Sequence, residues 1–334
     1  MSTKVAINGF GRIGRGFLRA ALTGGTDLDV VAVNDLTDAA TLAHLLSYDS
    51  TMGRLDAQVE ADGDSLVIDG RKIAVHAERD PGKLPWGELG VDVVVESTGI
   101  FTDGTKARAH IEAGARKVLI SAPATNEDIT LAYGINHQDY DPATHHIVSN
   151  ASCTTNCLAP LAKVLHEGVG LEHGLMTTVH AYTQDQNLQD GPHKDPRRAR
   201  SAALNIVPTS TGAAKAIGAV LPELNGRLAG LSLRVPVPVG SLTDLSAYVS
   251  RPTTAEEING LFADAAAGPL AGVLRHTDAP LVSTDIVGDP ASCIFDSKLT
   301  TVTGDGRHVK IFGWYDNESG FSHRLVDVAR LLGS

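Results

Sequence analysis

The stretch VAINGFGRIGRGFLRAAL, residues 5–22, decides the fold of the first part of the chain. A short apolar run leads into the spacing Gly9-x-Gly11-x-x-Gly14, and apolar residues at helical spacing follow it. Glycines between a strand and a helix let the backbone turn tightly and approach a pyrophosphate, whose charge then faces the amino end of the helix. The stretch therefore predicts the first βαβ unit of a Rossmann-type dinucleotide-binding domain.

The next apolar run, LDVVAVND, ends in Asp35. A carboxylate about 20 residues beyond the last glycine of this motif accepts hydrogen bonds from an adenosine ribose and repels a 2′-phosphate. The alternative, that these glycines and Asp35 are only turn residues, is weaker because the motif lies between a strand and a helix. NAD is therefore the expected cofactor, in preference to NADP.

The two parts of the chain differ in how their apolar residues are spaced. Up to about residue 150, short β-branched runs alternate with helical segments, which is typical of a doubly wound parallel sheet. The segment 57–80 interrupts this rhythm with two Asp-Gly turns, so we expect an antiparallel hairpin insert at the sheet edge. Beyond residue 171, long runs alternate with period two, and a helix is predicted over 318–332. The fold class is α/β: a Rossmann-type dinucleotide-binding domain plus an α+β catalytic domain with a mixed or antiparallel sheet.

Composition excludes several classes of protein. The chain has 334 residues, 43% of them hydrophobic, and no apolar run reaches the length of a membrane span, so we expect no membrane role. A net charge of −11 argues against nucleic acid as a primary partner. The basic run HKDPRRAR at 193–200 is interpreted as part of an ordered loop that meets a neighbouring subunit. The amino terminus enters an apolar strand without a signal-peptide pattern, so a cytoplasmic location is expected.

The stretch SNASCTTNC, residues 149–157, holds two of the three cysteines. Cys153 follows a predicted strand and begins a predicted helix, where the helix dipole and free N–H groups stabilise a thiolate. A nucleophilic thiol also needs a basic partner. Of the 13 histidines, His180 stands out because it ends the strand LMTTVH and precedes a long loop rich in hydroxyl and arginine side chains.

Cys157, one turn after Cys153, is predicted to be a buried packing residue, with a minor chance of a disulfide to Cys153 under oxidation. No metal is expected, because no second cluster with ligand spacing accompanies these thiols and Cys293 is distant in sequence. Pro160 predicts a kink or irregular first turns in the helix, since proline removes a backbone hydrogen bond.

Seven motifs are spread over the whole length of the chain: NGFGRIGR, VVVESTG, ASCTTNC, VHAYTQDQ, STGAAKAIG, RVPVP and WYDNESGFSHR. In this order and spacing they resemble the phosphorylating glyceraldehyde-3-phosphate dehydrogenase family, of which ASCTTNC is the signature. By position, this resemblance implies that Cys153 is the nucleophile and His180 its base. It also implies groups that bind the substrate phosphate and inorganic phosphate: Ser152, Thr154, Thr183, Arg198, Thr211, Gly212 and Arg234, of which Arg198 is the less secure.

For NAD, the resemblance implies contacts from Arg12, Ile13, Asp35, Arg79, Ser121 and Asn317, in addition to Gly9, Gly11 and Gly14. It also implies that the last helix returns to the cofactor domain, which would then comprise residues 1–150 and about 317–334, with the catalytic domain at 151–316. A homotetramer is implied as well.

The expected reaction is the NAD-dependent oxidation and phosphorylation of D-glyceraldehyde 3-phosphate to 1,3-bisphosphoglycerate. It would proceed through a hemithioacetal and a thioester on Cys153, with inorganic phosphate as the second substrate. One alternative is a family member that oxidises erythrose 4-phosphate. Another is a thiol acyl hydrolase, in which water resolves the acyl-enzyme.

Overall fold

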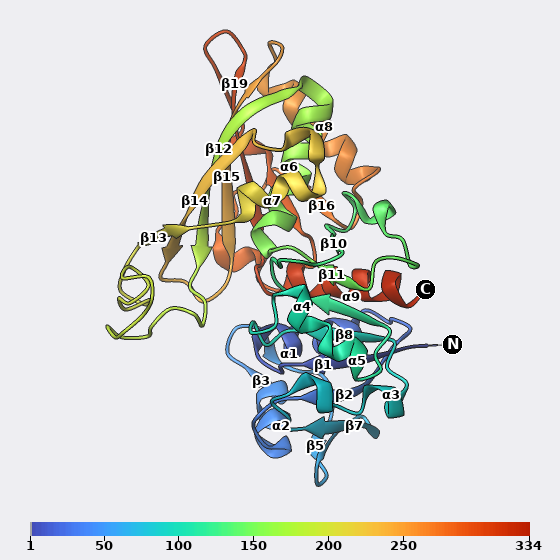
Figure 1. Cartoon of the computed structure of the whole chain (residues 1–334). Helices are drawn as coiled ribbons and strands as arrows, with labels where there is room; N and C mark the ends of the chain where they lie inside the picture. The colour runs from blue at the N-terminus through green and yellow to red at the C-terminus, as the bar shows by residue number, and fades with distance from the viewer. Residues whose placement is uncertain (1) are drawn as a thin grey trace. The chain divides into compact units, whose positions relative to one another are not determined.

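A computed structural model describes residues 2–334 (Figure 1). The chain divides into two compact units. The first contains the residues up to Leu131, His137–Ala151 and Ser322–Ser334, and the second contains Ala132–Asn136 and Ser152–Phe321. Helix α9 (Ser319–Gly333) begins in the second unit and has most of its length in the first. Its apolar side chains Phe321, Leu325 and Val328 are buried, as the helical spacing predicts.

The first unit is built on a largely parallel sheet. Its strand order is β10 (Ile129–Thr130), β11 (Ile147–Ser149), β9 (Lys117–Ile120), β8 (Val93–Glu96), β1 (Thr3–Asn8), β2 (Leu28–Asn34), β7 (Arg71–His76), β6 (Ser65–Ile68) and β5 (Val59–Ala61). The strands from β10 to β7 are parallel, while β6 and β5 pair antiparallel at the edge. The predicted doubly wound sheet and its hairpin insert are both confirmed. The order of strands along the sheet reverses at β1, because β2 lies on one side of it and β8 on the other, and such a switch point is where open α/β sheets bind ligands.

The helices of the first unit follow the predicted alternation. They are α1 (Arg12–Thr23), α2 (Ala39–Ser47), α3 (Trp86–Leu89), α4 (Gly104–Ala107) and α5 (Ala109–Glu112), and a short hairpin of β3 (Tyr48–Asp49) and β4 (Gly53–Arg54) follows α2. Asp38 fixes the start of α2, because its carboxylate accepts a hydrogen bond from the Thr41 N–H at 2.9 Å. The helical segment between β8 and β9 consists of two short helices, α4 and α5.

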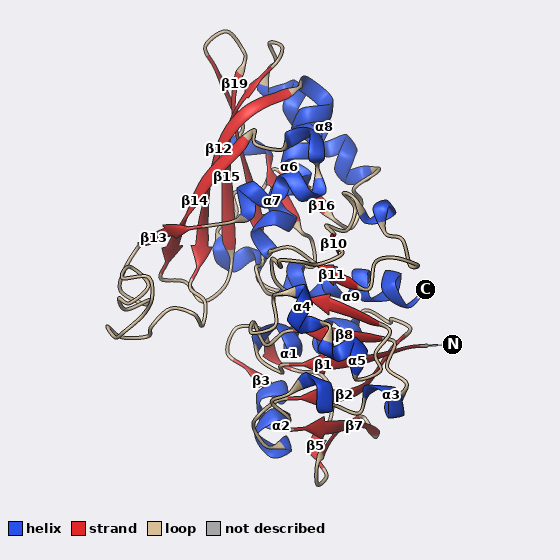
Figure 2. Ribbon diagram, in the orientation of Figure 1, coloured by secondary structure: helices blue, strands red, loops and turns tan. Residues whose placement is uncertain are grey.

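The second unit contains a mixed sheet, as predicted. Its strand order is β13 (Val207–Ser210), β14 (Leu228–Val235), β12 (Leu171–Ala181), β15 (Ser241–Val249), β19 (His308–Tyr315), β17 (Cys293–Asp296) and β16 (Leu274–Thr277), with β18 (Thr301–Thr303) beside β19. Helices α6 (Cys153–Val169), α7 (Ala213–Val220) and α8 (Ala255–Ala267) lie along one face of this sheet (Figure 2). Residues 182–206 form a long loop without helix or strand, between β12 and β13 (Figure 1).

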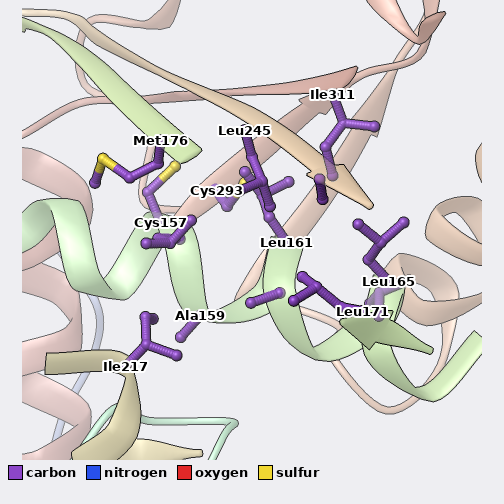
Figure 3. Packing of buried hydrophobic residues seen from close by; sticks show 14 of the residues in the cluster. Cys157, Ala159, Leu161, Leu165, Leu171, Met176, Ile217, Leu245, Cys293 and Ile311 are labelled. Carbon is purple, nitrogen blue, oxygen red and sulfur yellow. The ribbon is translucent and has the colours of Figure 1, made fainter. Parts of the chain in front are cut away.

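The core between α6 and the sheet contains the two remaining cysteines (Figure 3). Cys157 is completely buried, which confirms its predicted packing role. Cys293 belongs to the same cluster, although 136 residues separate it from Cys157. Gly313 of β19 makes room for both: a Cβ there would lie 2.6 Å from the Cys293 sulfur and 3.2 Å from the Cys157 sulfur. All three cysteines are free thiols.

Helix α6 continues without interruption through Pro160, so of the two outcomes predicted there, a kink or irregular first turns, the second is wrong. Proline removes a single backbone hydrogen bond, the one that would end on the Asn156 carbonyl. The turns on both sides are anchored by buried side chains, among them Leu158 and Leu161, and this packing outweighs the local loss.

Candidate active site

Cys153 is the first residue of α6 and follows a tight turn after β11. Ala151 in that turn has φ +55°, a left-handed conformation that L-residues other than glycine seldom adopt. Ser152 caps the helix, because its hydroxyl accepts a hydrogen bond from the Thr155 N–H at 3.0 Å. The predicted position of the thiol between a strand and a helix start is confirmed.

The structure brings Cys153 and His180 together within the second unit. The Cys153 Sγ lies 3.4 Å from His180 Nε2. On the other side of the ring, Nδ1 lies 2.6 Å from the Ala181 carbonyl oxygen. Nδ1 also lies 3.1 Å from Arg234 Nη1, which can only donate, whereas the Ala181 carbonyl can only accept. We assign the ring hydrogen to Nδ1 because the carbonyl contact is the shorter one, and the lone pair of Nε2 then faces the thiol. In this tautomer His180 can accept the thiol proton.

Burial governs the protonation of both groups. It raises the pKa of the Cys153 thiol to about 11, although the Arg234 charge acts in the opposite direction. Burial also lowers the pKa of His180 to about 3, and the Arg234 charge adds to this shift. The thiolate predicted from the helix terminus is therefore disfavoured as an isolated charge. Transfer of the proton from Sγ to Nε2 creates both charges at once, 3.4 Å apart, and their mutual attraction offsets the cost of desolvation.

Arg234 lies beside this pair because β14 runs parallel to β12 and Arg234 is paired in register with His180. Its Nη1 donates to the Thr183 hydroxyl at 2.8 Å and to the Ala181 carbonyl at 3.1 Å. Its Nε is buried and has no hydrogen-bond partner in residues 2–334. A buried guanidinium with an unused N–H is suited to an anion.

Arg198 belongs to the same polar group through Asp185. The Asp185 carboxylate accepts hydrogen bonds from the Thr183 hydroxyl and from Arg198 Nη1. Arg198 Nε donates to the Thr209 hydroxyl at 2.9 Å. The structure therefore joins Thr183, Arg198 and Arg234 in one network.

The other predicted phosphate ligands are distributed differently. The Thr154 hydroxyl is buried and hydrogen-bonded to the Tyr315 hydroxyl at 2.8 Å, so it is directed into the core. Thr211 and Gly212 lie at the start of α7, where the Thr211 hydroxyl accepts from the Ala213 N–H at 3.2 Å.

In the first unit, the glycine motif has the geometry that a pyrophosphate requires. Gly9 has φ +91°, and a Cβ there would meet the Thr98 nitrogen at 2.6 Å. At Gly14 a Cβ would lie 2.2 Å from the Gly9 carbonyl oxygen. A Cβ at Gly11 would meet nothing within 4 Å, and no side chain caps α1 at this residue. The amino end of α1 thus presents open space and backbone N–H groups, and these residues fit a dinucleotide.

The predicted cofactor residues around this loop are held by the sheet. Asp35 follows β2, and its carboxylate accepts a hydrogen bond from the Phe10 N–H at 2.8 Å. Arg12 forms an ion pair with Asp49 at 2.5 Å, and Ile13 is the next residue of α1. Hydrogen bonds from Arg12 and from the backbone N–H groups of Met52 and Thr51 lower the pKa of Asp49, overcoming the opposing effect of burial.

Three more predicted cofactor residues lie elsewhere. Arg79 is exposed in the loop after β7. Ser121 follows β9, and its N–H donates to the Glu96 carbonyl at 2.9 Å. Asn317 is in the second unit, where its side-chain oxygen accepts from Ser241 Oγ at 2.9 Å and from the Gly240 N–H at 3.2 Å. These two bonds orient the Asn317 amide so that its NH₂ group remains the donor.

Several polar residues near the thiol were not predicted from the sequence. Tyr315 accepts or donates hydrogen bonds at 2.8 Å to both Thr154 and Thr178, and its ring lies edge-on to that of His180 at 5.9 Å between centroids. Asp185 links two of the predicted anion ligands. The motifs VHAYTQDQ and WYDNESGFSHR contain both residues, but nothing in their local pattern indicates these partners.

Other features bear on the metal, membrane and nucleic-acid predictions. Within residues 2–334, no group of three or more His, Cys, Asp or Glu side chains is arranged to hold a metal ion. Across the same residues, none of the helices combines the length and the hydropathy of a membrane span. In the basic run, Arg198 and Arg200 form ion pairs with Asp185 and Asp190, which offset their charges.

Comparisons with known proteins agree over both units. Residues 3–104 match the family described as glyceraldehyde 3-phosphate dehydrogenase, NAD binding domain, and residues 152–317 match the corresponding C-terminal domain. The chain is 64% identical over 333 residues to glyceraldehyde-3-phosphate dehydrogenase 1 of Streptomyces avermitilis, covering 100% of this chain and 99% of that protein. It is 64% identical over 332 residues to the Kitasatospora aureofaciens enzyme of that name, with 99% of each chain covered. Identity to the Mycobacterium bovis protein of the same name is 60% over 339 residues, covering 100% of this chain and 99% of that one. The chain therefore belongs to the glyceraldehyde-3-phosphate dehydrogenase family.

Proposed function

We propose that the chain oxidises D-glyceraldehyde 3-phosphate with NAD and inorganic phosphate, forming 1,3-bisphosphoglycerate as a step of glycolysis. The observation that carries the proposal is the Cys153–His180 pair, with the Sγ 3.4 Å from a ring nitrogen that has its lone pair available. It lies in the segment that matches the family's C-terminal domain. The full-length relatives carry the name of this activity.

In this proposal His180 first accepts the Cys153 proton, and the thiolate adds to the aldehyde carbon. The imidazolium returns the proton to the carbonyl oxygen, which gives a hemithioacetal. NAD, when bound, supplies the hydride acceptor. His180 Nε2 takes the hydroxyl proton of the hemithioacetal as the hydride departs, and a thioester remains on the Cys153 sulfur.

Inorganic phosphate then attacks the thioester carbon, the C–S bond breaks, and the acyl phosphate leaves. We assign the anion sites to Arg234 with Thr183, to Arg198, and to the helix starts at Ser152–Thr154 and Thr211–Gly212. The buried Nε of Arg234 supports this assignment, because a guanidinium N–H without a partner gains most from a charged oxygen. For Thr154 the backbone N–H is the proposed donor, since its hydroxyl is bonded to Tyr315. The Cys153 N–H is the proposed donor to the developing oxyanion.

We assign NAD binding to Gly9, Gly11, Arg12, Ile13, Gly14, Asp35, Arg79 and Ser121 in the first unit, and to Asn317 in the second. The open amino end of α1 supports this assignment for the pyrophosphate. The proposed domains are residues 1–150 with about 317–334 for the cofactor and 151–316 for catalysis.

A homotetramer is proposed as the working form. On the face of the second sheet opposite α6, α7 and α8, four half-buried apolar side chains are neighbours in the strand register: Leu233, Val179, Leu242 and Trp314. On the nearby loop, Leu188, Leu204 and Ile206 are 77%, 81% and 67% exposed. Apolar surface of this kind is typical of contacts with another subunit. We also propose a cytoplasmic location, which is consistent with three free thiols.

The test is an NAD reduction assay with glyceraldehyde 3-phosphate, with and without inorganic phosphate, and repeated with NADP. We expect phosphate-dependent NADH formation. Erythrose 4-phosphate as the preferred aldehyde would favour the related family activity, and acyl release without phosphate would favour a hydrolase.

Cys153→Ser is the matched variant for this assay. The serine hydroxyl is a much weaker nucleophile than the cysteine thiol at neutral pH, so turnover should fall below detection while NAD still binds. Turnover close to that of the wild type in Cys153→Ser would refute the assignment of the nucleophile.

A further inference from the structure

A chain of buried hydrogen bonds in the first unit has no part in the proposed chemistry. It links five side chains, each at most 5% exposed: Trp86, His110, Glu96, Asn8 and Asn34. Glu96 ends β8, Asn8 ends β1 and Asn34 ends β2, so the chain crosses three adjacent strands at their carboxyl ends. This is the edge of the sheet where the dinucleotide loops begin.

The direction of each bond at the Trp86 end is fixed by chemistry. Trp86 Nε1 can only donate, and it lies 3.0 Å from His110 Nδ1. His110 Nδ1 therefore accepts, and the ring hydrogen is on Nε2. That nitrogen lies 3.0 Å from Glu96 Oε2, to which it donates.

Glu96 is the convergence point of the network. Besides His110, the Asn8 side-chain amide donates to Oε2 at 2.6 Å. The other oxygen, Oε1, accepts from the Thr98 N–H at 2.9 Å and from the Thr98 hydroxyl. Four donors thus form hydrogen bonds to one carboxyl group. All four are satisfied only if both oxygens of that group act as acceptors.

Glu96 also determines which side-chain atoms of Asn8 and Asn34 donate hydrogen bonds and which accept them. Because Asn8 gives its NH₂ to Glu96, its oxygen is left to accept from Asn34 Nδ2 at 2.7 Å. Asn34 in turn forms two hydrogen bonds to the backbone of Glu78. Its Nδ2 donates to the Glu78 carbonyl at 2.9 Å, and its Oδ1 accepts from the Glu78 N–H at 2.8 Å. One carboxylate therefore fixes the orientation of both amides.

Three residues of this network each precede a proposed cofactor residue. Asn8 precedes Gly9, Asn34 precedes Asp35, and Glu78 precedes Arg79. The Thr98 backbone also packs against Gly9, as the 2.6 Å approach to a Cβ there demonstrates. Three loops that are far apart in sequence are thereby tied to Glu96.

We infer that Glu96 is a positioning residue for NAD: it sets the relative placement of the loops that hold the ADP-ribose half of the cofactor. The inference rests on the cofactor residues assigned under the proposed function. The Glu96 side chain is 2% exposed and hydrogen-bonds to Asn8, His110 and Thr98, so it acts on the cofactor loops through these residues.

Glu96→Gln tests the inference with little change in volume. The glutamine amide can adopt two orientations. In one its NH₂ group faces Asn8 Nδ2 and His110 Nε2, and in the other it faces the Thr98 N–H, so in either case a donor faces another donor. We expect the Kd for NAD and the Kd for ADP-ribose to rise together, each by about tenfold, as one unsatisfied buried donor implies. kcat at saturating NAD should stay within about twofold of the wild type. Calorimetric titration and initial rates measure these quantities.

Two further variants separate positioning from general stability. Lys117→Met removes buried bonds to the Pro142 and His145 carbonyls at the start of β9, the opposite end of the sheet. It should lower the melting temperature without changing either Kd. Trp86→Phe removes one donor from the far end of the network, and we expect about a threefold rise in both Kd values. If Glu96→Gln does not fold, the two Kd values of Trp86→Phe test the inference in its place.

Wild-type Kd values in Glu96→Gln, or equal weakening by Lys117→Met, would overturn the inference. If Glu96→Gln does not fold, unchanged Kd values in Trp86→Phe would have the same effect. Failure of the wild-type chain to bind NAD would instead refute the proposed function, which keeps the two failures distinct.

Discussion

At the scale of single residues, the active-site pair combines two groups that burial keeps neutral. The thiol of Cys153 has a raised pKa and the imidazole of His180 a lowered one, so neither ionises alone near pH 7. Their separation of 3.4 Å makes the joint change, thiolate with imidazolium, the accessible route to a nucleophile. His180 thus provides both a proton acceptor and the counter-charge.

His180→Asn tests whether formation of the Cys153 thiolate depends on the imidazole of His180. Without the imidazolium, the thiolate forms as an isolated charge, and because its pKa is raised toward about 11, the thiolate fraction at pH 7 falls. We expect Cys153 alkylation by iodoacetamide to slow by at least tenfold at pH 7, at one factor of ten per pKa unit, and to recover as the pH rises toward that value. An alkylation profile that matches the wild type between pH 6 and 10 would contradict the pairing. Cys153→Ser serves as the blank for the other thiols.

The local sequence pattern located this pair but not its surroundings, of which Arg234, Thr183 and Thr154 were assigned only through the family resemblance. Cys153 and His180 were predicted because each lies at the end of a strand, a local pattern, and because the family resemblance matches them by position. The neighbours depend on non-local pairing: Arg234 reaches His180 only through the register of β12 with β14. Likewise, Tyr315 meets Thr154 across 161 residues of sequence. Such contacts follow from the fold and cannot be inferred from spacing.

At the scale of elements, α6 serves both as the start of the site and as the spine of the second core. Its amino end carries Cys153, and its buried face packs on β12, β15 and β19. The strand and helix pattern in the sequence predicted these elements, including the hairpin at the edge of the first sheet. It could not predict that Cys293 packs beside Cys157, since that depends on where β17 lies relative to β19.

Gly313→Ala tests this packing. Its methyl group would lie 2.6 Å from the Cys293 sulfur and 3.0 Å from Leu161 Cδ1, so β19 would be pushed away from α6. Overpacking of this kind typically costs about 1–3 kcal/mol, and the midpoint of thermal unfolding of the second unit should fall. The double variant Gly313→Ala with Cys293→Ala should recover part of this loss. Equal midpoints for the single and the double variant would show that the sulfur is not the obstacle.

For the whole molecule, the half-buried apolar row on the second sheet and the exposed apolar side chains of the loop are the features that packing within one chain does not account for. The four-strand apolar row and the loop side chains Leu188, Leu204 and Ile206 all belong to the second unit. Removing such surface from water contributes about 25 cal/mol per Å², which makes assembly favourable. The charge pattern of the sequence indicated a subunit contact at this loop, but the apolar row became evident only from the register of the strands.

Leu204→Asp combined with Ile206→Asp should weaken assembly. Each substitution places a charge in a contact that would exclude water, so the proposed tetramer should dissociate to smaller species. Sedimentation velocity of the wild type is expected to give the mass of four chains, and that of the variant a lower mass. Leu22→Asp, which alters an exposed leucine on α1, should leave the mass unchanged. A wild-type chain that sediments as a monomer would exclude the proposed assembly.

The loop at residues 182–206 has a further property that follows from its ion pairs. It has no helix or strand, and it is held together by backbone hydrogen bonds, such as that from the Gly191 N–H to the Ala199 carbonyl at 2.9 Å, and by the ion pairs Arg198–Asp185 and Arg200–Asp190. The second pair is 62% and 58% exposed at its two side chains, whereas Arg198 is only 22% exposed. Dissolved electrolyte screens exposed charges first, and the screening length falls from about 10 Å at 0.1 M to about 3 Å at 1 M. Concentrated salt should therefore weaken Arg200–Asp190 first, whereas Arg198–Asp185, next to Thr183 and Arg234, is weakened less even though Asp185 is 40% exposed.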